Sequence, residues 1–204
     1  VDLARRLPKR GWVPRVVALG GGGGLEEELR SSGIEVIIGP ETQDRRATHT
    51  FAQHVIARCS QETVFHTHLG ADQWLGYPAH KRGFPWMVTA HNDDRDLPWL
   101  KRKMRVFAWN RAQRVACVSK AVQAFWRQQG VCSSRLEVLP NGIDLTRFSP
   151  KTTLQYADDP LIVCVGRLTE QKRQAWILRA LAELDDRPWR LEFVGDGPMR
   201  AELE

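Results

Sequence analysis

Short apolar runs alternate with helical segments along almost all of this 204-residue chain, and this pattern constrains the fold most strongly. Turns rich in Gly, Pro, Asn and Asp separate the segments. The pattern predicts strands at 13–19, 34–38, 63–66, 86–90, 114–118, 136–139, 161–165 and 190–194. It predicts helices at 1–7, 25–32, 47–59, 71–81, 98–110, 120–129 and 171–184, and one starting near Pro198. Such alternation is typical of an α/β protein with parallel sheets covered by helices on both faces.

The polar segment 151–160 interrupts this alternation, and we interpret it as a linker between two domains. Residues 1–150 form the first predicted domain. Residues 151–204 form the start of a second, because two strands and two helices are too few for a complete doubly wound domain. Val1 and Glu204 both fall inside predicted helices, so we expect the chain to be truncated at both ends.

The composition is that of a soluble globular protein, with 42% hydrophobic and 26% charged residues. No apolar run approaches the roughly 18 residues of a spanning helix, and no signal peptide opens the chain. The four cysteines have no CxxC spacing, which argues against a zinc or redox site and favours the cytoplasm. Residues 1–150 hold 22 Lys/Arg against 14 Asp/Glu, a balance of +8, so the first domain would attract an anionic partner.

Gly20–Gly24 follows a predicted strand and precedes a predicted helix, as a phosphate-binding loop does. The third glycine of the dinucleotide fingerprint is missing, since Leu25 or a neighbour stands there. The next helix opens with Glu26–Glu28, whose carboxylates suit the helix dipole but repel a pyrophosphate. We therefore interpret the run as a flexible loop.

Arg167 and Lys172 stand just after a predicted strand, at the start of a predicted helix. A helix N-terminus offers free N–H groups to an anion, and two cations add positive charge for a leaving diphosphate without a metal. The alternative is that both are solvated surface cations. Their setting beside Gly166 at a strand end favours the diphosphate interpretation.

His91 directly follows the predicted strand 86–90. Ligands of parallel sheets bind at the carboxyl ends of strands, so a histidine there can polarise a substrate hydroxyl. His66 and His68 stand at another strand end and could line the same cleft. A purely structural role is the alternative for each of these histidines.

The segment 99–114 is strongly basic and contains Lys101, Arg102, Lys103, Arg105, Arg111 and Arg114. One apolar helical face is expected to pack on the core, formed by Leu97, Leu100, Met104, Phe107 and Ala108. In a second, compatible interpretation, the basic surface 101–114 rests on anionic lipid headgroups with the help of Trp99 and Trp109. No aromatic-basic reader motif is present, so no nucleic-acid partner is expected.

Four motifs follow one another in the chain: Val118-Ser119-Lys120-Ala121, Leu139-Pro140-Asn141-Gly142-Ile143-Asp144 with Phe148-Ser149-Pro150, Val165-Gly166-Arg167-Leu168 with Gln171-Lys172, and Val194-Gly195-Asp196-Gly197-Pro198. In order and spacing they resemble the retaining glycosyltransferases of family 4, the glycosyl transferases group 1. The segments 1–36, 64–68 and 88–91 are similar to that family's N-terminal region and its strand-end histidine motifs.

The resemblance implies a GT-B architecture, in which an N-terminal Rossmann-like domain receives the acceptor and a C-terminal one binds the sugar nucleotide. It implies that the donor diphosphate binds to Gly166, Arg167 and Lys172. It places the catalytic residue His91 near the transferred sugar, and the cleft would be lined by His68, Ser119 and Asn141. It also implies transfer with retention of configuration, with no metal and no cofactor beyond the nucleotide-diphosphate sugar donor.

Three features differ from the family's pattern. The glycine-rich start of the first domain would lie upstream of Val1, and the two glutamates that contact the donor sugar would lie beyond Glu204. Arg173 replaces the glycine that commonly follows the diphosphate lysine. We therefore expect this fragment to be inactive by itself.

Together these patterns predict an enzyme that moves a sugar from a nucleotide sugar to a glycan or glycolipid acceptor, in the synthesis of cell-envelope polysaccharide or lipopolysaccharide. It would be cytoplasmic and peripheral on the inner face of the cytoplasmic membrane. Two other classes stay open. One is a non-catalytic nucleotide or glycan binder with the same fold, and the other is a dinucleotide-dependent oxidoreductase, against which the glycine run argues.

Overall fold

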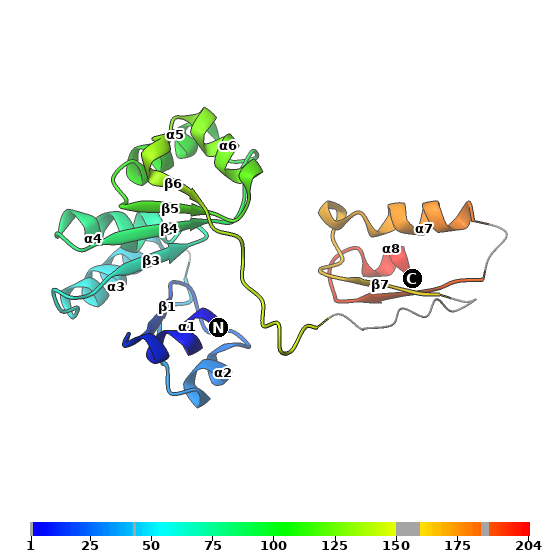
Figure 1. Ribbon diagram of the computed structural model, residues 1–204, viewed down its shortest axis with the longest axis horizontal. Helices are drawn as coiled ribbons and strands as arrows, with labels where there is room; N and C mark the ends of the chain where they lie inside the picture. The colour runs from blue at the N-terminus through cyan, green and yellow to red at the C-terminus, as the bar shows by residue number, and fades with distance from the viewer. Residues whose placement is uncertain (1, 43, 150–159, 185–187) are drawn as a thin grey trace. The chain divides into compact units, whose positions relative to one another are not determined.

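The computed structural model describes residues 2–42, 44–149, 160–184 and 188–204, so the predicted linker lies outside the described residues except for Pro160. The chain divides into two compact units, Val1–Gly142 and Ile143–Glu204, which are described separately below (Figure 1). The predicted domain boundary at residue 150 falls among the residues that are not described, and it stays a prediction.

The first unit begins with a small parallel sheet. Its elements are α1 (Asp2–Arg6), a 3-10 turn (Leu7–Arg10), β1 (Arg15–Ala18), α2 (Glu26–Ser31) and β2 (Glu35–Ile38). The two strands pair from Arg15 opposite Glu35 to Ala18 opposite Ile38. They form a sheet of their own, with a separate small core of Leu29, Ile34 and Val36.

A four-stranded parallel sheet forms the rest of the first unit, in the order β3-β4-β5-β6. Its strands are β3 (Phe65–His68), β4 (Trp86–Ala90), β5 (Arg114–Cys117) and β6 (Leu136–Val138). Its helical segments are α3 (Arg45–Ala57), a π-helical turn (Asp72–Gly76), α4 (Tyr77–Lys81), α5 (Trp99–Trp109), α6 (Lys120–Gln129) and a 3-10 turn (Ser133–Arg135). Because all four strands are parallel, their carboxyl ends share one edge of the sheet.

Tryptophans dominate the core behind this sheet. Trp86 and Trp126 are fully buried, and the Trp86 indole Nε1 donates a hydrogen bond of 2.9 Å to Thr67 Oγ1 on the neighbouring strand. A side chain at Gly76 would collide with the Trp86 ring, which explains why a glycine stands in the π-helical turn. This packing fixes the segment that follows β3 against β4.

The second unit contains β7 (Leu161–Val165), a 3-10 turn (Glu170–Lys172), α7 (Gln174–Ala182), β8 (Arg190–Val194) and α8 (Arg200–Leu203). The two strands are parallel, from Leu161 opposite Arg190 onward. The predicted continuous helix 171–184 is wrong. Arg173 has a φ of 56°, and this left-handed residue ends the 3-10 turn before α7 begins.

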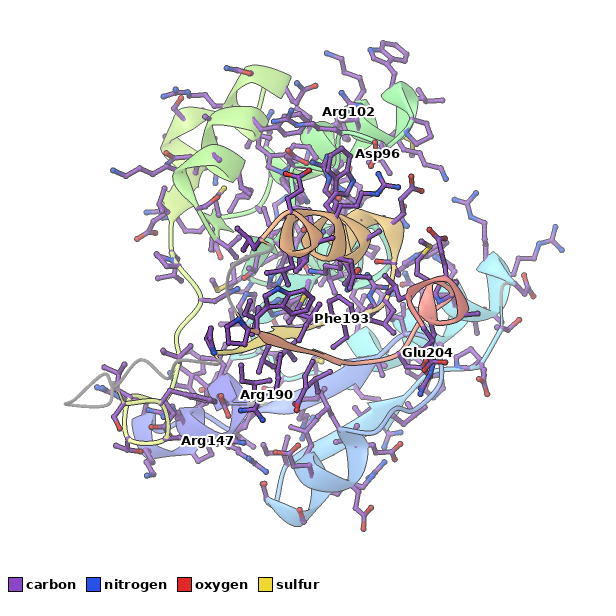
Figure 2. All side chains as sticks on the ribbon, turned by 90° about the vertical axis from the view of Figure 1, so that its right-hand side faces the viewer. Asp96, Arg102, Arg147, Arg190, Phe193 and Glu204 are labelled. Atoms are coloured by element: carbon purple, nitrogen blue, oxygen red, sulfur yellow. The ribbon has the colours of Figure 1, made fainter. Side chains whose placement is uncertain are left out.

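α7 lies along one face of the β7–β8 sheet, and the Phe193 side chain of β8 points toward that face (Figures 1 and 2). The other face of β7 carries exposed apolar side chains, with Val165 76% exposed. Among the described residues of this unit, helices therefore cover one face of the sheet rather than the expected two.

Candidate functional site

The site residues predicted in the first unit all lie at or just after the carboxyl ends of strands in the four-stranded sheet. His68 is the last residue of β3, and His91 comes directly after β4. Ser119 and Asn141 follow β5 and β6. Ligands of parallel sheets bind at this edge, so the topology agrees with the predicted positions.

Two of these residues touch one another. His68 Nδ1 lies 3.0 Å from His91 Nε2, within hydrogen-bond distance. His66 joins them, because its ring centroid is 4.3 Å from that of His68 and its Nε2 is 2.7 Å from Thr89 Oγ1. The structure thus forms a row of three histidines across β3 and β4.

The surroundings of this row disfavour positive charge. Burial, together with His66 and His91, lowers the pKa of His68 to about 4. Burial and His91 also lower the pKa of His66. At pH 7 both imidazoles are therefore neutral, and in the His68–His91 hydrogen bond one nitrogen donates a proton and the other accepts it.

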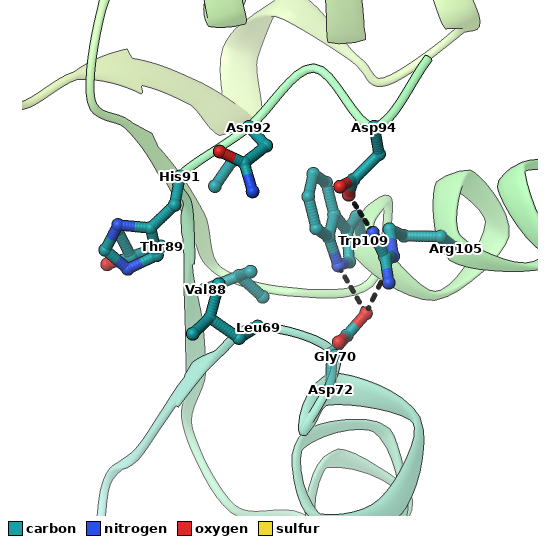
Figure 3. A pocket seen from close by; sticks show the side chains of 11 residues that line it. Leu69, Gly70, Asp72, Val88, Thr89, His91, Asn92, Asp94, Arg105 and Trp109 are labelled. Carbon is teal, nitrogen blue, oxygen red and sulfur yellow. Dashed lines mark hydrogen bonds and ion pairs between the residues drawn. The ribbon is translucent and has the colours of Figure 1, made fainter. Parts of the chain in front are cut away.

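Beside His91 lies a cavity of about 120 Å³ (Figure 3). Its walls come from the segments after β3 and β4 and from α5, and include Leu69, Gly70, Asp72, Asn92, Asp94, Arg105 and Trp109. His68, Ser119 and Asn141 do not line it. The cavity contains both acidic and basic groups, so its polar walls suit a hydrogen-bonding ligand.

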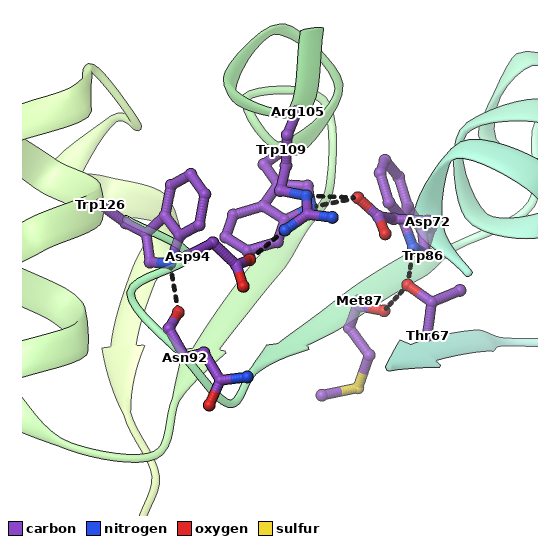
Figure 4. A network of polar contacts seen from close by, with 9 residues as sticks. All are labelled: Thr67, Asp72, Trp86, Met87, Asn92, Asp94, Arg105, Trp109 and Trp126. Carbon is purple, nitrogen blue, oxygen red and sulfur yellow. Dashed lines mark hydrogen bonds and ion pairs between the residues drawn. The ribbon is translucent and has the colours of Figure 1, made fainter. Parts of the chain in front are cut away.

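A polar network connects these walls (Figure 4). The Arg105 guanidinium forms an ion pair with Asp94, and its Nε lies 3.6 Å from Asp72 Oδ2. The same oxygen accepts a 2.8 Å hydrogen bond from Trp109 Nε1. The sequence interpretation did not include these residues in the site. The adjacent Asp93 and Asp94 after a strand were a local signal for one of them, whereas Arg105 was counted among surface cations.

The orientation of α5 differs from the predicted one. Leu100, Met104 and Phe107 were expected in the core, but they are 62%, 60% and 52% exposed. Ala108 is buried as expected, and the other inward positions of the helix are occupied by Arg102, Arg105, Val106 and Trp109. Arg105 turns inward because Asp72 and Asp94 neutralise its charge there.

Ser119 and Asn141 have different surroundings. Ser119 is the N-cap of α6, where its Oγ accepts a 3.2 Å hydrogen bond from the Val122 amide. Asn141 is exposed, and its side chain makes no hydrogen bond within the described residues. The structure thus gives Ser119 the role of a helix cap. That Ser119 and Asn141 line a cleft stays a prediction.

The turns after β7 and β8 pack backbone to backbone. The amides of Gly166 and Leu168 donate to the carbonyls of Val194 and Asp196, at 3.0 and 2.9 Å. A side chain at Gly195 would clash with the Gly166 carbonyl. The glycines at these strand ends therefore permit a close approach of the two turns.

Arg167 and Lys172 emerge from these fixed turns into solvent. Both side chains are exposed, and neither forms an ion pair or hydrogen bond in the part of the chain that the structure describes. The Arg167 carbonyl accepts a 2.9 Å hydrogen bond from Gln174 Nε2, which holds its backbone. The Lys172 stem passes 3.9 Å from the position a Cβ at Gly166 would take.

A second cavity, of about 310 Å³, lies beside these turns. Arg173 and Arg179 line it, together with the buried Gln174, but Arg167 and Lys172 do not. The assignment of Gly166, Arg167 and Lys172 to a donor diphosphate stays a prediction. No group of three His, Cys, Asp or Glu within the described ranges is placed to hold a metal ion.

The glycine run is a loop between β1 and α2, as expected. A side chain at Gly22 would collide with the carboxylate of Glu26, so a negative group already lies against this loop. This placement leaves the loop unsuited to the pyrophosphate of a dinucleotide.

Residues 1–147 match the family model of Glycosyltransferase Family 4, and residues 159–204 match that of Glycosyl transferases group 1. A curated relative, the GDP-mannose-dependent alpha-(1-6)-phosphatidylinositol monomannoside mannosyltransferase of Mycolicibacterium smegmatis, is 27% identical over 195 residues. The match covers 88% of this chain and 51% of that enzyme. The chain therefore spans about half the length of this relative.

Two solved structures share the fold. Anabaena Alr3699/HepE, in complex with UDP and glucose, has a TM-score of 0.76 at 18% identity, over 98% of this chain and 58% of HepE. A glycosyltransferase from Rickettsia africae has a TM-score of 0.76 at 19% identity, over 99% and 57% of the two chains. The neighbours agree with the predicted pair of Rossmann-like domains, and the Family 4 match covers the whole first unit and more than half of the chain. The chain belongs to Glycosyltransferase Family 4.

Proposed function

We propose that this chain belongs to an enzyme that transfers a sugar from a nucleotide-diphosphate sugar to a hydroxyl of a glycan or glycolipid. The observation that carries the proposal is that both units match glycosyltransferase family models, one after the other. The complex of HepE with UDP and glucose supports a nucleotide-sugar donor. The mycobacterial relative, named for a phosphatidylinositol monomannoside, supports a glycolipid acceptor and a role in the cell envelope.

In the proposed reaction, the bond between the anomeric carbon of the sugar and the diphosphate oxygen breaks. The acceptor hydroxyl oxygen bonds to the anomeric carbon on the same face, so the configuration is retained. The hydroxyl proton passes to the departing phosphate oxygen, and the nucleoside diphosphate leaves. Arg167 and Lys172 stabilise the charge that develops on that group, because charge-assisted hydrogen bonds to phosphate are strong.

His91 would act near the transferred sugar by hydrogen bonding to one of its hydroxyls. Its contact with His68 supports this role, because a neutral neighbour holds the His91 ring without adding a charge. Such a hydrogen bond orients the sugar for attack. The neighbouring cavity, at the carboxyl edge of the sheet, supplies room for a hydroxylated group.

The test is a transfer assay with the full-length protein that contains this chain. A panel of nucleotide sugars is incubated with glycolipid and oligosaccharide acceptors, and the anomeric configuration of the product is read by NMR. We expect one donor to be consumed and a product with the donor's configuration. An inverted product would contradict the retaining mechanism, and donor binding without any transfer would favour the non-catalytic binder instead.

We also propose that the outer face of α5 rests on an anionic membrane. This face presents Trp99, Leu100, Met104 and Phe107, and Trp99 is 69% exposed. Beside them lie the exposed cations Lys101, Lys103 and Arg111. An apolar stripe flanked by cations is complementary to acyl chains beneath anionic headgroups. Among the described residues, no helix is long and apolar enough to cross a bilayer.

Co-sedimentation with vesicles tests this surface. We expect binding to vesicles that contain phosphatidylglycerol, and a loss of about 30-fold in affinity for the Lys101→Ala/Lys103→Ala variant, at about 1 kcal/mol per lysine. The matched control is Lys81→Ala/Lys120→Ala, which removes the same charge elsewhere on the first unit. Equal losses in both variants, or dimers formed through this face in solution, would overturn the membrane proposal.

A further inference from the structure

The segment 91–98, between β4 and α5, has no helix or strand of its own and begins with His91. Side chains from two helices hold it. Trp126 Nε1 of α6 donates a 2.9 Å hydrogen bond to the Asn92 carbonyl. Arg102 Nη2 of α5 donates to the carbonyls of Arg95 and Leu97, at 2.8 and 2.9 Å. These contacts hold three carbonyls of the segment, and Arg105 holds its carboxylate Asp94.

Arg105 joins this segment to the one that follows β3. Its side chain is 18% exposed and lies between Asp94, after β4, and Asp72, after β3. Asp72 is 4% exposed and is further fixed by the Trp109 indole. The guanidinium also lies 5.6 and 5.9 Å from the ring centroids of Trp109 and Trp126. Arg105 therefore connects the segments that follow β3 and β4 (Figure 4).

Two strained residues flank this bridge. Leu69 and Asp94 have φ values of 49° and 45°, and both line the cavity. A left-handed conformation costs a non-glycine residue about 1–2 kcal/mol, so surrounding contacts must hold it in place. The ion pair with Arg105 is such a contact for Asp94.

The charge balance of the bridge distinguishes it from a phosphate site. Asp72 and Asp94 carry two negative charges around the single positive charge of Arg105, which leaves the group with a net charge of −1. A second anion would be repelled. The guanidinium is thus committed to the two carboxylates rather than to a donor diphosphate.

We propose that Arg105 is a positioning residue: by bridging Asp72 and Asp94, it fixes the segment 91–98 and sets the position of His91 beside the cavity. The catalytic consequence rests on the proposed glycosyl transfer, whereas the structural consequence does not. Lysine is a poor replacement for Arg105 here, because its ammonium is a compact point charge, whereas the planar guanidinium presents Nε to Asp72 and the separate Nη1 to Asp94.

Hydrogen exchange on the chain described here tests the structural half. The amide to follow in the segment 91–98 is that of Leu97, which donates a 3.0 Å hydrogen bond to the Asp94 carbonyl. In Arg105→Met, we expect its exchange to rise by about tenfold or more, while the β7–β8 unit is unchanged. The matched control is Lys103→Met, an exposed cation on the same helix, which should leave the segment as protected as in the wild type. Unchanged exchange in a folded Arg105→Met variant would overturn the proposal.

Asp94→Asn tests the same bridge from the carboxylate side and keeps the Arg105 side chain. It is the variant to use if Arg105→Met does not fold. It should raise exchange in the same segment. If Asp94→Asn folds and leaves exchange there unchanged, the proposal fails. In a folded Arg105→Lys variant, exchange should also rise, and full protection would show that charge alone suffices and would contradict the bridging role.

Steady-state kinetics of the full-length protein test the catalytic half. A displaced His91 should lower kcat of Arg105→Met by about 10- to 100-fold, with the donor KM within about twofold of wild type. A large rise in donor KM with normal exchange would make Arg105 a ligand-binding residue and overturn the proposal. If exchange rises in Arg105→Met but the wild-type full-length protein transfers no sugar, the proposed function is refuted, whereas the bridging role of Arg105 is still supported.

Discussion

The two candidate regions differ in how far the protein itself fixes the functional side chains. At the carboxyl edge of the four-stranded sheet, Arg105 is held by Asp72 and Asp94, and His68 contacts His91. At the ends of β7 and β8, the backbone turns are tightly packed, but the side chains of Arg167 and Lys172 extend into solvent. The comparison indicates that the first region is preorganised, whereas a bound ligand must order the cations of the second.

The largest expected difference in stability is between acidic residues of the two regions. Asp72→Asn keeps the Arg105–Asp94 ion pair but removes the buried negative charge that Arg105 and the Trp109 indole both contact, and it should lower the free energy of unfolding by about 2 kcal/mol. Asp196→Asn, at an exposed position in the second unit, should change it by less than about 0.5 kcal/mol. Urea unfolding followed by tryptophan fluorescence measures both. Equal effects would show that the first region is no more fixed than the second.

Ser119→Ala separates a cap from a cleft residue. Loss of the hydrogen bond to the Val122 amide should lower the free energy of unfolding by about 1 kcal/mol. Ser119→Asp restores a capping oxygen and should recover that stability. If transfer by the full-length protein falls in Ser119→Ala while stability is unchanged, the predicted role in the cleft is correct and the cap is not.

Because the histidine row lies in the first region, we expect it to make the free energy of unfolding of that region depend on pH. His68 has a folded pKa of about 4, below its unfolded value, so the unfolded chain binds more protons between these two pH values. Stability should therefore fall as the pH decreases from about 6.5 toward 4. His68→Gln should lose less stability over this range than the wild type, as measured by the urea midpoint. Parallel curves would contradict the lowered pKa of His68.

The smallest expected effect is a gain of stability in the second unit. Arg173 has a φ of 56° between the 3-10 turn and α7, where glycine is favoured. Arg173→Gly should raise the free energy of unfolding by about 0.5–1 kcal/mol. The matched substitution Arg179→Gly, inside α7, should lower it by about 1 kcal/mol. A destabilised Arg173→Gly protein would show that the Arg173 side chain contributes more than its backbone strain costs.

The sequence was informative where local pattern determines structure. The strands 86–90, 161–165 and 190–194 and the helix 120–129 were predicted with the bounds the structure gives, because apolar runs there end at clear turn residues. The sequence also placed His68 and His91 at the ends of two strands, and the structure brings the two rings within 3.0 Å of each other. Ser119 was indicated as a site residue, although its visible contact is that of a helix cap.

The sequence was uninformative where contacts between residues far apart in the chain determine which side chains are buried. Arg105 pairs with Asp72, which lies 33 positions earlier in the chain. The inward orientation of Arg105 could therefore not be predicted from the helical pattern of α5 alone. The same pairing exposes Leu100, Met104 and Phe107, which the pattern placed in the core. The break in the predicted helix 171–184 depends on the left-handed backbone of Arg173, a conformation that no arginine indicates by itself.

Calorimetric titration of a nucleoside diphosphate sugar tests whether Arg167 and Lys172 bind the donor diphosphate. If Arg167 and Lys172 bind the diphosphate, the Arg167→Ala/Lys172→Ala variant should lose about 100-fold or more in donor affinity. Arg179→Ala/Arg200→Ala, which removes the same charge from the second unit, should bind as the wild type does. Wild-type affinity in Arg167→Ala/Lys172→Ala, or equal losses in both variants, would show that these two cations do not bind the diphosphate.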